Sequence, residues 1–96
     1  EALDFYAKKN IKDNTTYFKK TNLYFVNKNF FINPEEVLLR SITVILNSLS
    51  GRHYAPRGKK ISRLIRLMSS QNKLKKITLG GCIFEKIHKT VRISKE

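Results

Sequence analysis

The sequence predicts a single α+β domain spanning residues 1–96, in which helices pack against a small antiparallel sheet. Two apolar stripes with helical spacing support the helices, one through residues 38–49 and one through residues 61–68. Residues 76–95 instead alternate short β-rich runs with turn residues, as strands do. With 96 residues, 41% of them hydrophobic, the chain can form one core of modest size.

The N-terminal third gives weaker signals. Leu3, Tyr6 and Ala7 have helical spacing and predict a helix over about 2–9. Because the chain begins at Glu1 and not at Met, we expect this helix to run in from an upstream part of a longer protein. Residues 10–22 are rich in Asn, Lys and Thr and are expected to form a loop. Residues 23–32 have high β-propensity around a polar centre, which fits either one broken strand or a short hairpin.

The strongest helix is predicted over about 34–50. Asn33 is expected to cap it, with Pro34 at the first helical position and Glu36 closing a capping box. Gly51 is expected to end it as the C-cap residue. Its apolar stripe consists of Leu38, Ile42, Ile45 and Leu49.

A further helix is predicted over about 59–70, after Pro56. It is amphipathic, with Ile61, Leu64, Ile65 and Met68 on one face and Lys59, Arg63 and Arg66 on another. Strands follow at about 76–79, 82–88 and 90–95. Gly80-Gly81 and His88-Lys89 are expected to form the turns between them.

Positive charge is concentrated in one part of the sequence. The chain has 20 basic and 7 acidic residues, a net charge of +13. Residues 52–76 contain no acidic residue but nine basic ones: Arg52, Arg57, Lys59, Lys60, Arg63, Arg66, Lys73, Lys75 and Lys76. Such a run repels itself, and a polyanion such as nucleic acid would offset that repulsion by exchanging condensed counterions for protein cations. The simpler alternative is a solvated basic surface.

We predict an RNA-binding surface in this part of the chain. Guanidinium groups and aromatic rings suit phosphates and unstacked bases, and the linker before the second helix carries both. The Tyr54 ring could equally well be packed at the helix junction. The predicted RNA-binding residues are Arg52, His53, Tyr54, Arg57, Lys59, Lys60, Arg63 and Arg66.

The sequence gives little support for catalysis by this segment. The pair Glu35–Glu36 is explained by helix capping, and His53 and His88 lie far apart. The single cysteine, Cys82, excludes an intramolecular disulfide, fits a reducing cytoplasmic environment, and is expected in the core. We therefore expect no catalytic residue, metal ligand or cofactor site here, and no membrane contact, since no apolar stretch reaches the length of a span.

Several motifs in fixed order resemble one family. The run from Asn33-Pro34-Glu35-Glu36 to Leu49 and the segment Gly51–Arg57 resemble the region behind the catalytic domain of bacterial tRNA(Ile)-lysidine synthetase. Thr78-Leu79-Gly80-Gly81-Cys82 resembles that family's Leu-Gly-Gly-Cys strand, and the ending Val91–Glu96 resembles the end of the same domain. The resemblance covers about residues 23–96.

The resemblance implies a role in holding tRNA. The family's enzyme is an ATP-dependent ligase of the PP-loop type, which adenylates the wobble cytidine of an isoleucine tRNA with a CAU anticodon and then attaches lysine. Its nucleotide loop has no counterpart in these 96 residues. ATP and Mg would therefore be bound by a catalytic domain upstream, and this segment would contact that domain and the tRNA.

Two other functions remain open from the residues alone. The chain could be a structural module whose apolar helix and sheet dock neighbouring domains without touching RNA. It could also be a free-standing ribosomal or DNA-associated protein, although the lack of a basic tail argues against this.

Overall fold

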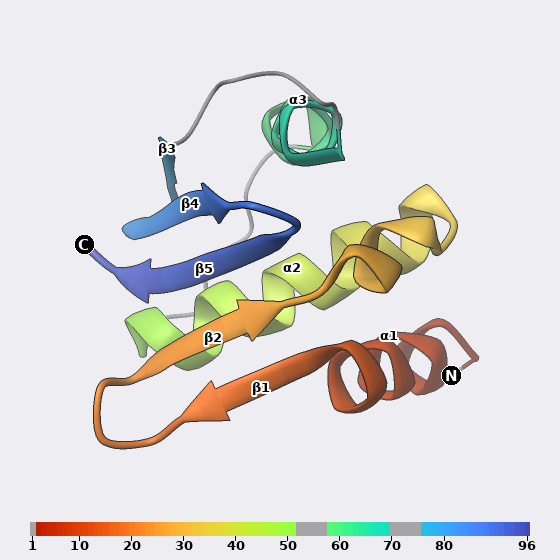
Figure 1. Ribbon diagram of the computed structural model, residues 1–96. Helices are drawn as coiled ribbons and strands as arrows, with labels where there is room; N and C mark the ends of the chain where they lie inside the picture. Colours follow the sequence, from red (N-terminus) through yellow and green to blue (C-terminus); the bar gives the residue numbers. More distant parts are fainter. Residues whose placement is uncertain (1, 52–57, 70–75) are drawn as a thin grey trace.

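A computed structural model describes residues 2–51, 58–69 and 76–96 of the chain (Figure 1). The fold is α+β, as predicted, with three α-helices, a short 3-10 helix and one antiparallel sheet in the described residues. The elements in chain order are α1 (Ala2–Asn14), β1 (Thr15–Phe18), β2 (Leu23–Val26), η1 (Lys28–Ile32), α2 (Glu35–Ser50), α3 (Gly58–Ser69), β3 (Lys76–Leu79), β4 (Cys82–Ile87) and β5 (Thr90–Lys95).

The sheet joins the two ends of the described chain. Its strand order is β1-β2-β5-β4-β3, and every neighbouring pair is antiparallel. The N-terminal hairpin meets the C-terminal three-stranded meander where β2 pairs with β5, with Val26 opposite Val91 and Tyr24 opposite Ile93. Folding must therefore bring together segments more than sixty residues apart, which local contacts alone do not guide.

The core lies between the sheet and the helices. Alternate strand residues face α2, among them Val26, Phe84 and Ile93, which are at most 2% exposed. α2 runs behind β2 and β5 (Figure 1), and α1 and α3 pack against α2. The core residues that α2 contributes are Leu38, Ile42, Ile45, Leu46 and Leu49.

The opposite face of the sheet carries a mixed surface. The rings of Phe18 and Phe25 pack edge to face with their centroids 5.4 Å apart. Arg92 and Glu85, opposite each other on β5 and β4, form an ion pair. No described helix is long and apolar enough to cross a membrane.

The predicted loop over residues 10–22 is wrong. α1 continues to Asn14, and residues 15–18 form β1. The polar residues continue the helix because their side chains find partners there: Asn14 Nδ2 donates to Asn10 Oδ1 at 2.8 Å, and Thr15 Oγ1 donates to the Ile11 carbonyl at 2.6 Å. Pairing with β2 then extends the next four residues as a strand.

The strand predicted within residues 23–32 is confirmed for its first part only, and neither a broken strand nor a hairpin extends to residue 32. β2 ends at Val26 and the chain turns into η1. Asn27 causes the change, since its side-chain oxygen accepts hydrogen bonds from the N–H groups of Asn29 (2.9 Å) and Phe30 (3.2 Å). The turn buries the Phe30 ring completely, whereas Ile32 stays 77% exposed.

The predicted cap of α2 is also wrong, although its end is confirmed. Pro34 stands at the N-cap position and no side chain caps the helix. The Asn33 amide is used elsewhere: its Nδ2 donates to Asn10 Oδ1 at 2.9 Å and to the Phe30 carbonyl at 3.2 Å. At the other end Gly51 adopts a left-handed φ of 70° and donates its N–H to the Asn47 carbonyl at 3.0 Å.

The two predicted C-terminal turns are confirmed. Gly80 and Gly81 have φ values of 60° and 76° between β3 and β4, as a tight two-residue hairpin turn requires. His88 has a φ of 57° between β4 and β5. The strand bounds agree with the predicted ones to within a residue.

Candidate nucleic-acid interface

α3 presents two faces of opposite character. Ile61, Leu64 and Met68 are each 2% exposed and belong to the core cluster. Lys59, Arg63 and Arg66 follow one another at intervals of three and four residues, so that they share a face turned away from the buried one. All three are exposed, as is Lys60 beside them. The sequence prediction of an amphipathic helix with a cationic outer face is confirmed.

A groove runs along this cationic face, where α3 meets the start of α2. Its volume is about 860 Å³ and it is open to solvent on one side. α3 contributes cations and a hydroxyl to it, and the segment from η1 into α2 contributes an amide and a carboxylate. The lining residues are Asn33, Glu35, Leu38, Gly58, Lys59, Ser62, Arg63, Ile65 and Arg66.

Half of the predicted RNA-binding residues can be placed. Lys59, Arg63 and Arg66 line the groove together, and Lys60 is exposed on the same helix outside its lining. Arg52, His53, Tyr54 and Arg57 lie outside the described residues, as do Lys73 and Lys75. Their contribution to the surface stays a prediction. Lys76 is exposed at the start of β3.

Glu35 is a groove residue that the sequence analysis missed. Its Oε1 accepts a hydrogen bond of 2.6 Å from Ser62 Oγ, which joins the first turn of α2 to α3. The run of residues 52–76 contains no acid, but the fold places this carboxylate among three of its cations. The only signal in the sequence was the pair Glu35–Glu36, which helix capping seemed to explain.

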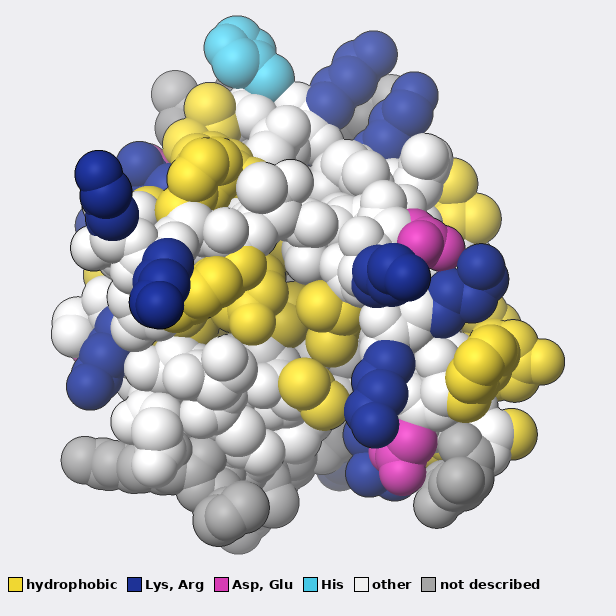
Figure 2. Space-filling model, turned by 90° about the horizontal axis from the view of Figure 1, so that it is seen from below, with side chains coloured by type: hydrophobic (Ala, Val, Ile, Leu, Met, Phe, Trp, Pro, Cys, Tyr) yellow, Lys and Arg dark blue, Asp and Glu magenta, His cyan; other side chains and the backbone are white. Residues whose placement is uncertain are grey.

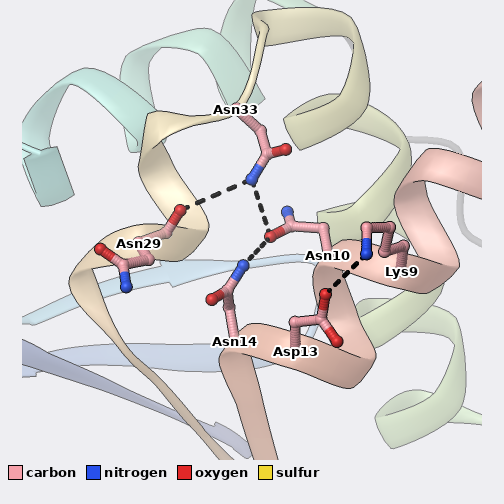
Figure 3. Close-up of polar contacts among 6 residues, drawn as sticks. All are labelled: Lys9, Asn10, Asp13, Asn14, Asn29 and Asn33. Carbon is pink, nitrogen blue, oxygen red and sulfur yellow. Dashed lines mark hydrogen bonds and ion pairs between the residues drawn. The ribbon is translucent and has the colours of Figure 1, made fainter.

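A network of asparagines holds the segment that leads into the groove (Figure 3). Asn10 Oδ1 accepts hydrogen bonds from the Nδ2 atoms of Asn14 and Asn33, at 2.8 and 2.9 Å. Asn10 Nδ2 donates to Ser41 Oγ at 3.3 Å and to the Phe30 carbonyl at 3.4 Å. The buried Asn10 amide therefore fixes α1, η1 and α2 relative to one another. It also fixes Asn33, which lines the groove.

The ion pairs of the described residues lie elsewhere. Lys9 Nζ is 3.3 Å from Asp13 Oδ2, and Arg40 Nη1 is 3.3 Å from Asp4 Oδ1. On the side of α1 and β1, Lys and Arg side chains are interspersed with hydrophobic ones and the acidic side chains lie beside basic ones (Figure 2). None of these ion pairs involves the cations of α3. That face therefore differs from the α1 side in the balance of its charges.

The described residues offer little for catalysis. Cys82 is fully buried in β4, as predicted, and this burial raises the pKa of its thiol, with Lys95 acting in the opposite direction. A buried thiol with a raised pKa is a poor nucleophile. In the described ranges no three His, Cys, Asp or Glu side chains are grouped to hold a metal ion. The lining of the groove itself offers cations, one carboxylate and hydrogen-bonding groups.

Comparison with protein families, with curated proteins and with solved structures finds no match to this chain.

Proposed function

We propose that this chain binds tRNA through the cationic face of α3. The observation that carries the proposal is the shared groove of Lys59, Arg63 and Arg66 on one exposed helix face. Cations in a row along a groove suit the phosphates of a folded RNA, which line every side of the polymer. Neutralising them releases condensed counterions, and this release supplies much of the binding free energy.

We further propose that the domain serves an ATP-dependent ligase that attaches lysine to the wobble cytidine of an isoleucine tRNA with a CAU anticodon. The support is the resemblance of residues 23–96 to the domain that follows the catalytic one in tRNA(Ile)-lysidine synthetase. In that arrangement a separate catalytic domain binds ATP, Mg and lysine, and this domain holds the tRNA. It would act in the cytoplasm.

One observation favours a second candidate, a structural docking module. Phe5, Tyr6 and Ile32 expose 63%, 54% and 77% of their surface. The rings of Phe5 and Tyr6 on α1 pack edge to face with their centroids 5.4 Å apart, so they form a small apolar patch. A neighbouring domain could cover this patch while α3 stays in solvent, and this alternative requires no RNA contact.

Charge reversal tests the tRNA proposal. We expect the triple variant Lys59→Glu, Arg63→Glu, Arg66→Glu to bind the CAU-anticodon tRNA more weakly at every salt concentration. The slope of log K against log[salt] should fall by about 2–3, because each lost phosphate contact removes about 0.7–0.9. Binding measured by fluorescence anisotropy across a KCl series gives both quantities.

The matched control reverses the same number of charges away from α3. Lys12, Lys19 and Lys20 are exposed on α1 and in the β1–β2 turn. Their triple change to Glu should weaken binding less and keep most of the slope. If the α3 variant keeps the wild-type slope, the cationic face does not contact phosphates and the docking module becomes the better account.

A further inference from the structure

The groove beside α3 has an apolar floor as well as polar walls. Its apolar lining residues are Leu38 of α2 and Ile65 of α3. Leu38 is 2% exposed and Ile65 is half-buried, so that Ile65 supplies the apolar surface that a ligand can reach. The volume of about 860 Å³ lies within the range of about 300–1,000 Å³ typical of small-ligand sites. An apolar floor is of no use to a phosphate, but it suits the flat face of a base.

The groove contains a carboxylate as well as three cations, and a site for duplex RNA requires only the cations. A duplex presents its phosphates outward and pairs its bases inside. Such phosphates need only the cations of the groove, and not its carboxylate or its apolar surface. An unpaired nucleotide presents phosphates, hydrogen-bond donors and an apolar ring together, and this combination matches three cations, a carboxylate and an apolar floor.

Glu35 is positioned to accept further hydrogen bonds. Its Oε1 is held by Ser62 Oγ at 2.6 Å, and an ionised carboxylate has about four acceptor positions. Asn33 stands beside it in the lining, with its Nδ2 already donating to Asn10 Oδ1 and to the Phe30 carbonyl. The 2′-hydroxyl of a ribose is a donor of the kind that a held carboxylate binds, and it distinguishes RNA from DNA.

We infer that this groove binds one unpaired ribonucleotide of a single-stranded region of the RNA. The base lies on the exposed part of Ile65, the flanking phosphates contact Lys59, Arg63 and Arg66, and Glu35 accepts a hydrogen bond from the ribose 2′-hydroxyl. The inference rests on the proposed RNA binding and names the part of the RNA that this site takes.

The test compares three nucleic acids and measures a ratio of affinities. The probes are a single-stranded RNA of mixed sequence, the DNA of the same sequence, and an RNA duplex without unpaired nucleotides. We expect the wild-type chain to prefer the single-stranded RNA to both. Glu35→Ala should reduce the RNA-to-DNA preference by about tenfold, the lower end of what one hydrogen bond to a charged group contributes. Glu35→Gln keeps an acceptor and should retain part of the preference.

Glu36→Ala is the matched control. Glu36 is exposed in the same first turn of α2 and lies outside the groove lining, so its loss removes an equal charge at the same helix end. It should leave the RNA-to-DNA preference unchanged. Ile65→Ala should lower affinity for the single strand by about threefold, since it removes part of the apolar floor, and leave duplex affinity unchanged. Thermal unfolding verifies that each variant is folded.

The outcomes separate the two proposals. If Glu35→Ala leaves the RNA-to-DNA preference intact, or if the wild type binds duplex RNA as tightly as the single strand, the unpaired-nucleotide site is wrong and tRNA binding by α3 still stands. If the wild type retards none of the three probes at low salt, both proposals fail together.

Discussion

Asn10 shows how much of this fold depends on a single polar side chain. It is 3% exposed, and its amide makes four hydrogen bonds to α1, η1 and α2. In the described residues no buried side-chain nitrogen or oxygen lacks a partner. The network is therefore complete, and removing its centre takes away four hydrogen bonds at once.

We expect Asn10→Ala to lower the free energy of unfolding by about 2 kcal/mol, because it removes hydrogen bonds to the buried Ser41 hydroxyl, the Phe30 carbonyl and the half-buried Asn33 amide. Chemical denaturation monitored by circular dichroism measures this. Asn29→Ala is the control: the Asn29 side chain is exposed and points away from the network (Figure 3), and its change should stay within about 0.5 kcal/mol. Equal effects in the two variants would mean that the network contributes no stability.

The sequence could not reveal these residue-scale roles. Asparagine fits a helix cap, a turn or a buried network equally well, and what decides is the partner that the fold brings near. Asn33 therefore looked like a cap and proved to be a donor to Asn10. Glu35 looked like a helix-end charge and proved to line the groove, because a partner twenty-seven residues away, Ser62, holds it there.

At the scale of elements, periodicity predicted most of the structure. α2, α3 and the three C-terminal strands have strong patterns of period 3.6 or 2 and agree with their predicted bounds to within about a residue. α1 was predicted too short, and β1 was missed. Thr15–Phe18 has no buried residue, so its strand conformation depends on pairing with β2 and not on an alternating pattern.

The β3–β4 turn gives a prediction at this scale. A Cβ at Gly81 would meet no atom within 4 Å, so that its φ of +76° is the sole obstacle to a side chain. We expect Gly81→Ala to destabilise the domain by about 1 kcal/mol, the cost of a left-handed conformation for an L-residue. Gly81→Asn should recover part of this, because asparagine tolerates that region.

Gly58→Ala is the control, and its expected effect on stability has the opposite sign. Gly58 begins α3 with equally open space around it and without a positive φ. Alanine there should be neutral or stabilising by up to about 1 kcal/mol, since it favours the helix. Thermal unfolding of both variants compares them. If both alanines destabilise equally, backbone conformation at the turn is not the cause.

At the scale of the whole molecule, the net charge can be counted from the sequence, whereas the order of the strands cannot be predicted from it. The fold class followed from patterning, but the join of β2 to β5 could not be predicted, because nothing local links Val26 to Val91. The net charge of +13 is a sum that the sequence states directly. Its consequence is physical: a compact domain with this excess repels itself, and added salt should relieve the repulsion.

We therefore expect the unfolding midpoint to rise with KCl between about 0.01 M and about 0.15 M, as the Debye length falls from about 30 Å to about 8 Å. A gain of about 1 kcal/mol would appear as about 4–8 °C in a domain of this size. Neutralising Lys59, Arg63 and Arg66 to Gln should reduce this gain more than neutralising Lys12, Lys19 and Lys20, because the three α3 cations share one helix face and repel one another there. Differential scanning calorimetry at both salt concentrations measures the two gains. Equal reductions would show that repulsion is spread evenly over the surface, and a midpoint that falls with salt would show that attractive pairs dominate.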